Sequence, residues 1–151
     1  MFTFSKNYLI KCLFTFIFRD KKAIPPGIAP STQVLDLRGN DIRVLHNNVF
    51  LQLGITNLQR IYCSYCDIVE IEPRAFRRLT NLVELDLSEN AMREVPSEAW
   101  KHTKALMRLN LSGNPIKLIR YFHEKKKLNG LQLGMPLPSG AYRAFSPLQI
   151  K

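Results

Sequence analysis

Residues 82–92 read LVELDLSENAM, and this stretch decides the fold. Leu85 and Leu87 alternate with polar residues, which is the period of a short strand with one buried face. Asn90 follows three residues after Leu87. The same arrangement recurs 24 residues before and 24 residues after, starting at Leu58 and Leu106. One unit cannot bury its apolar face alone, so the units must stack on one another.

Four units share this pattern, and the earliest has two extra residues near its end. Asparagine ends each strand except in the second unit, where Cys66 replaces it. A buried asparagine amide satisfies backbone groups that would otherwise lack partners, whereas a thiol is only a weak donor. An aromatic column follows, which we expect to stack: Phe50, Phe76 and Trp100.

This signature is that of a leucine-rich repeat, so the sequence predicts an α/β leucine-rich repeat solenoid. Its parallel sheet lies on the concave side, with loops and short helical turns on the convex side. The four expected strands span Val34–Leu37, Arg60–Cys63, Glu84–Leu87 and Arg108–Leu111.

The stretch from Ile24 to Ile119 also resembles insect kekkon-type proteins. The residues that carry this resemblance are 57–62 (NLQRIY), 75–88 (AFRRLTNLVELDLS), 111–116 (LSGNPI) and Cys66. Kekkon-type proteins are single-pass membrane proteins whose extracellular leucine-rich repeats precede an immunoglobulin domain. The resemblance implies a cell-surface location for the parent protein and receptor modulation in signalling. No cofactor is expected.

The repeat pattern predicts four segments. Residues 1–23 form a signal-like or disordered segment, and residues 24–120 form the repeats. The aromatic residue of the fourth unit is due at position 124, which holds Glu124. The phenylalanine that fits the repeat, Phe145, lies 21 residues further along the chain. We therefore expect residues 121–141 to be an inserted, poorly packed loop on the convex side, and 142–151 to be the remnant of the fourth repeat. Neither end carries a cysteine-rich cap, which indicates a truncated fragment.

The charge distribution and the cysteine and histidine residues argue against nucleic-acid binding, metal binding and catalysis. The net charge is +10, but residues 31–120 contribute only +2 of it. A nucleic-acid partner is therefore not expected, because a basic binding face should lie on the folded part. Cys63 and Cys66 have no second cysteine pair, so no metal site is expected. His46, His102 and His123 lack repeated acidic or serine partners, so the sequence predicts neither catalytic residues nor an enzyme.

The residues between the buried leucines should face the concave side, where neighbouring strands lie about 4.8 Å apart. Tyrosine and arginine are typical anchors of protein interfaces. The expected protein-binding residues are Arg60, Tyr62, Tyr65, Glu84, Asp86, Glu89 and Arg108.

The function predicted from these observations is protein–protein recognition, as the extracellular ligand- or receptor-binding region of a cell-surface protein. A membrane would be contacted only through missing parts of the parent protein. Three alternatives stay open: an intracellular repeat scaffold, a truncated nonfunctional product, and nucleic-acid binding through the basic flanks.

Overall fold

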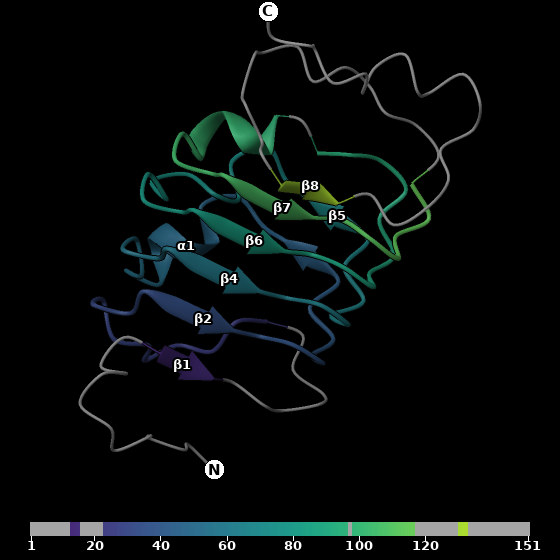
Figure 1. Cartoon of the computed structure of the whole chain (residues 1–151). Coiled ribbons are helices and arrows are strands. Elements are labelled where there is room, and N and C mark those ends of the chain that lie inside the picture. The colour runs from purple at the N-terminus through teal and green to yellow at the C-terminus, as the bar shows by residue number, and fades with distance from the viewer. Residues whose placement is uncertain (1–12, 16–22, 97, 117–129, 133–151) are drawn as a thin grey trace, which may run out of the picture.

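The computed structural model describes residues 13–15, 23–96, 98–116 and 130–132. These residues form a parallel six-stranded sheet in the order β1-β2-β4-β6-β7-β8, with each strand beside the next in a stack (Figure 1). The strands are β1 (Leu13–Thr15), β2 (Val34–Asp36), β4 (Arg60–Tyr62), β6 (Glu84–Asp86), β7 (Arg108–Asn110) and β8 (Gly130–Gln132). The predicted solenoid is confirmed.

The register of the sheet follows the repeat alignment. Ile61 pairs with Leu85, and Leu85 pairs with Leu109. The strands end one residue earlier than predicted, but the hydrogen-bond ladder continues through that residue. The backbone N–H of Cys63, for example, donates to the carbonyl of Asp86 at 2.8 Å.

Apolar side chains fill the space between the sheet and the convex side. Leu58 and Leu82 are fully buried, and Leu106 is 4% exposed. The ring of Phe76 stacks on both neighbours, 5.8 Å from Phe50 and 5.5 Å from Trp100 between centroids. The predicted aromatic column is therefore present, and it ties three consecutive repeats together.

The convex side is built from short elements, as expected. The strands β3 (Val44–Leu45) and β5 (Glu70–Ile71) pair in parallel, next to the helix α1 (Val49–Gln52) and the 3₁₀ helix η1 (Ala99–His102). None of these elements is long enough to bury much surface alone, so they depend on the repeats beneath them.

The asparagine column joins each repeat to the one before it. Nδ2 of Asn114 donates to the carbonyl of Leu87 at 2.8 Å, and its Oδ1 accepts from the N–H of Met92 at 3.1 Å. Asn90 makes the equivalent bonds one repeat earlier. These amides satisfy buried backbone groups, as the sequence predicted.

The structure corrects the expectation for the two flanks. Leu13–Thr15 pairs in parallel with β2, although residues 1–23 were expected to be poorly packed. Gly130–Gln132 pairs with β7 in the sheet, although residues 121–141 were expected to form a convex loop without a repeat period. The physical reason is that an unpaired strand edge leaves backbone donors and acceptors free to pair with another strand. The remaining residues of these segments lie outside the described residues, so the limits of the insertion and of the 142–151 remnant stay predictions.

The sequence does carry a signal for β8. Leu128, Leu131 and Leu133 follow Leu106, Leu109 and Leu111 at a constant interval of 22 residues. A search for a strict 24-residue interval passes over this fifth copy, because leucine-rich repeats vary between about 20 and 29 residues.

Candidate functional site

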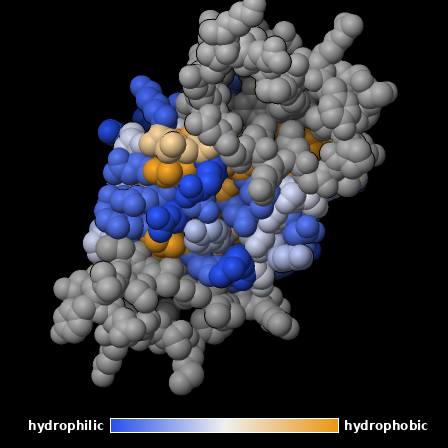
Figure 2. All heavy atoms as spheres, in the orientation of Figure 1, coloured by the Kyte–Doolittle hydropathy of each residue, from blue (hydrophilic) through white to orange (hydrophobic). Residues whose placement is uncertain are grey.

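The concave surface consists of the outward-facing strand residues of β2, β4, β6 and β7 and the residues that follow them. Figure 2 looks onto this side, where hydrophilic residues cover most of the described surface. The residues of the concave surface, column by column, are Val34, Arg60, Glu84, Arg108; Asp36, Tyr62, Asp86, Asn110; Arg38, Ser64, Ser88, Ser112; and Gly39, Tyr65, Glu89, Gly113.

Glu84 lies between two arginines on adjacent strands. Its Oε2 accepts a hydrogen bond from Nη2 of Arg108 at 2.6 Å and lies 3.8 Å from Nε of Arg60. The hydrogen bond to Glu84 raises the pKa of Arg108. Arg60 and Arg108 are about half exposed, so these ion pairs add little stability. Their main effect is to hold both guanidinium groups on the concave surface.

Tyr62 lies beside this cluster, on the middle column. Burial, and then the negative charge of Glu84, raises the pKa of Tyr62 above its usual value. The phenol therefore stays protonated and can donate a hydrogen bond. The guanidinium of Arg38 lies 5.8 Å from the centre of the Tyr62 ring, within reach of a cation–π contact.

Arg38 was not among the predicted binding residues. Its Nε and Nη2 donate to the two carboxylate oxygens of Asp36 at 2.9 and 2.6 Å. The column alignment placed Arg38 on the concave side, but the sequence could not show that Asp36 would orient it over Tyr62.

Asp86 forms a local turn with the residue two positions later. Its Oδ1 accepts from the backbone N–H of Ser88 at 2.9 Å and from its hydroxyl at 2.7 Å. Asn110 and Ser112 repeat the same arrangement in the next unit. These turns fix the ends of the strands, and the other carboxylate oxygen of Asp86 has no hydrogen-bond partner within the described part of the chain.

Tyr65 and Glu89 occupy turns rather than strands. Their φ angles are 55° and 51°, in the left-handed region, and glycine stands at the equivalent place in the first and fourth units, at Gly39 and Gly113. A residue with a Cβ is disfavoured there by about 1–2 kcal/mol. Tyr65 is nevertheless 66% exposed, so burial of its ring does not compensate.

The structure therefore divides the seven predicted residues into two groups. Arg60, Tyr62, Glu84 and Arg108 form one contiguous cluster on β4, β6 and β7. The other three lie at or beyond the strand ends, and no hydrogen bond or ion pair within the described residues joins their side chains to that cluster. Gly39 and Gly113 stand at the positions equivalent to Tyr65 and Glu89, and they were the sequence signal that these positions form a turn.

Other kinds of site find no support in the part of the chain that is described. No group of three or more histidine, cysteine, aspartate or glutamate side chains there is arranged to hold a metal ion. No described helix has the length and apolar character needed to cross a bilayer.

Comparison with known proteins agrees with the stacked geometry. Residues 56–116 match the family described as Leucine rich repeat. Mouse Tsukushi is 33% identical over 109 residues, which cover 69% of this chain and 30% of Tsukushi. The chain therefore spans about a third of that relative's length.

Two solved structures show the same fold. The structure titled as a TLR13–ssRNA13 complex superposes with a TM-score of 0.60 at 30% identity, over 69% of this chain and 15% of the other. The Toll–Spatzle complex of Drosophila superposes with a TM-score of 0.65 at 21% identity, over 86% of this chain and 22% of the other. The matching residues and the stacked strands together show that this chain carries leucine-rich repeats.

Proposed function

We propose that this chain is a protein-recognition module whose concave surface binds an extracellular or cell-surface protein. The observation that carries the proposal is the pair Tyr65 and Glu89. Both keep large side chains in a left-handed turn where the flanking repeats carry glycine. Backbone conformations that cost stability persist at binding sites, where the side chain gains its contacts from a partner.

The chemistry of the concave surface suits a protein. Tyr62 and Tyr65 offer aromatic area, and Arg38 lies over the ring of Tyr62. Tyrosine and arginine are residue types enriched among binding anchors. Three arginines stand against four carboxylates on this surface: Arg38, Arg60 and Arg108 against Asp36, Glu84, Asp86 and Glu89. This balance lacks the excess positive charge that a nucleic-acid phosphate backbone requires, even though one similar structure carries single-stranded RNA.

The location outside the cell is part of the same proposal. It is supported by relatives such as Tsukushi, which are secreted or cell-surface leucine-rich repeat proteins. The finer proposal is that the parent protein is kekkon-type, with a receptor as its partner. Its support is the sequence at 57–62 and 75–88, and this chain would then be one part of a larger extracellular region.

The test replaces Tyr65 and Glu89 by glycine, the residue of the neighbouring repeats. Tyr65→Gly/Glu89→Gly should fold at least as well as the wild type, because it removes two unfavourable φ angles. Binding of the labelled chain to proteins displayed on cells, measured by flow cytometry, should weaken about tenfold or more, as loss of an interface anchor does. Arg77→Ala, an exposed change on the convex side, is the matched control and should bind normally.

Two results would contradict the proposal. Equal binding by the wild type and the double variant would show that Tyr65 and Glu89 do not anchor a partner, which removes the observation that carries the proposal. Binding that disappears after nuclease treatment of the cells, but survives the double variant, would favour nucleic acid as the partner.

A further inference from the structure

The second repeat departs from the pattern twice, and both departures are cysteines. Cys63 takes a leucine position and Cys66 takes the asparagine position. Both side chains are fully buried, and the two sulfur atoms lie 2.8 Å apart. Two substitutions that meet in the core of the same repeat call for a joint explanation.

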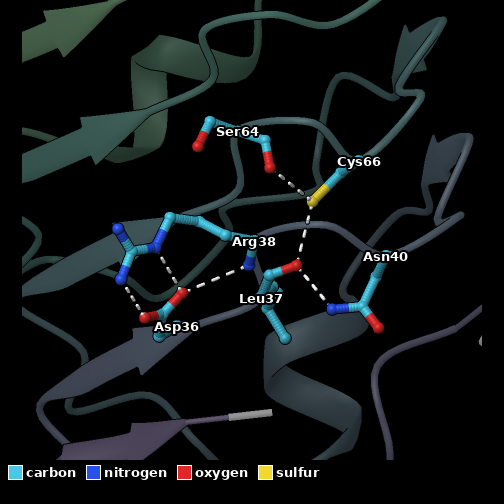
Figure 3. A network of polar contacts seen from close by, with 6 residues as sticks. All are labelled: Asp36, Leu37, Arg38, Asn40, Ser64 and Cys66. Carbon is cyan, nitrogen blue, oxygen red and sulfur yellow. Dashed lines mark hydrogen bonds and ion pairs between the residues drawn. The ribbon is translucent and has the colours of Figure 1, made fainter. Parts of the chain in front are cut away.

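Packing and hydrogen bonding explain only part of this arrangement. The thiol of Cys66 donates to the carbonyl of Leu37 at 3.0 Å (Figure 3). Asn90 makes the equivalent bond to the carbonyl of Cys63. The Leu37 carbonyl already accepts from Nδ2 of Asn40 at 2.5 Å. The thiol bond is therefore redundant, and its loss would leave no buried acceptor unsatisfied.

The backbone around Cys66 is also independent of its thiol. The N–H of Cys66 donates to Oδ1 of Asn90 at 3.0 Å, as does the N–H of Ile68. The asparagine of the third repeat thus holds this turn in place. Neither the turn nor the Leu37 carbonyl needs the sulfur to carry a proton.

We propose that Cys63 and Cys66 are joined by a disulfide bond within the second repeat, formed while the chain folds. The oxidant would be a disulfide, either of a small thiol such as glutathione or of a folding enzyme. The thiolate of one cysteine attacks one sulfur of that disulfide and releases one thiolate. The thiolate of the other cysteine then attacks the resulting mixed disulfide and releases the second. The two cysteines lose two protons and two electrons, and the oxidant becomes two thiols.

Burial sets the time at which the bond forms. An external disulfide cannot reach either sulfur once the first and third repeats cover the second, so the exchange must precede the final packing. The same cover shields the finished bond from reductants. This inference stands without the proposed concave-surface function, since it concerns only the core.

The sequence allows a direct test on the full chain. Trypsin cleaves after Arg60 and Arg74, so one peptide, residues 61–74, carries both cysteines, while Cys12 falls in another. The chain is refolded with reduced and oxidised glutathione, its free thiols are alkylated, and it is digested without reduction. We expect the 61–74 peptide to be unalkylated and lighter by two hydrogen atoms. Recovery of this peptide with both cysteines alkylated, with attached glutathione, or linked to Cys12 would overturn the proposal.

A variant that restores the consensus residues provides the control. Cys63→Leu/Cys66→Asn should fold, because the neighbouring repeats carry these residues at the same places. The urea midpoint of the wild type should fall when dithiothreitol is present throughout unfolding, and that of the variant should not change. Equal midpoints of the wild type with and without dithiothreitol, together with fully alkylated cysteines, would show that the thiols serve only packing.

Discussion

Nδ2 of Asn90 lies 2.7 Å from the carbonyl oxygen of Cys63, one repeat earlier in the chain. The same side chain donates to Leu87 and accepts from the N–H groups of Cys66 and Ile68. One buried amide therefore completes the backbone hydrogen bonds of two repeats.

Replacing this amide should destabilise the whole stack. Asn90→Ala leaves several buried backbone groups without partners, so we expect a loss of about 3 kcal/mol or more in the free energy of unfolding. Urea unfolding followed by circular dichroism measures it. Asn81→Ala is the control, because Asn81 is exposed and makes one long side-chain contact, 3.4 Å to Asn57. Similar losses for both variants would contradict the central role of Asn90.

Phe76 should be the most sensitive aromatic residue. It stacks on Phe50 and on Trp100, so Phe76→Ala opens a cavity between three repeats. The expected loss is about 3–5 kcal/mol. Phe76→Leu keeps most of the apolar volume and should lose clearly less, in the same urea titration. A loss of under about 1 kcal/mol for the alanine variant would show that the column is not part of the cooperative core.

Two glycines of the same column should respond alike to alanine. Gly39 and Gly113 have φ angles of 74° and 70°. A Cβ at Gly39 would meet nothing within 4 Å, whereas one at Gly113 would collide with the carboxyl group of Glu89. That carboxyl group is the far end of an exposed, flexible side chain and can move aside, so Gly39→Ala and Gly113→Ala should each lose about 1 kcal/mol in urea unfolding, from their φ angles.

A double variant tests this expectation. Adding Glu89→Ala to Gly113→Ala should change the free energy of unfolding little, because the carboxyl group can already move away. A loss for Gly113→Ala well above that for Gly39→Ala, recovered by Glu89→Ala, would show that the carboxyl group is held in place.

Glu72 should make stability depend on acid pH. Its carboxylate accepts from the N–H of Asn47 at 2.5 Å and lies 3.2 Å from Nδ1 of His46. The bond from Asn47, and then that from His46, lowers the pKa of Glu72 below its ordinary value of 4.5. The stabilising effect is complete above this ordinary value and is lost as pH falls through the lowered one.

The measurement compares urea midpoints of the wild type and Glu72→Gln from neutral to strongly acid pH. The difference between them should be largest at neutral pH and should shrink in acid. If the difference between the two urea midpoints stays constant over this pH range, the loss in Glu72→Gln comes from the changed side-chain geometry and not from the charge of Glu72.

The sequence alone determined the architecture of the repeats. Apolar residues at a constant interval, such as Leu58, Leu82 and Leu106, can leave water only by stacking, so strands, register and aromatic column followed from the pattern. It also placed Arg60, Tyr62, Glu84 and Arg108 on one surface, because residues at equal repeat positions lie on neighbouring strands.

Only the tertiary structure showed which segments outside the regular 24-residue pattern join the sheet. The strands at Leu13–Thr15 and Gly130–Gln132 form because β2 and β7 offer edges to pair with, and irregular spacing hid them from a fixed period. The orientation of Arg38 over Tyr62 and the contact between Cys63 and Cys66 depend on atoms brought together from different positions in three dimensions. A one-dimensional pattern specifies which residues share a column, but distances between side chains are set only when the columns pack.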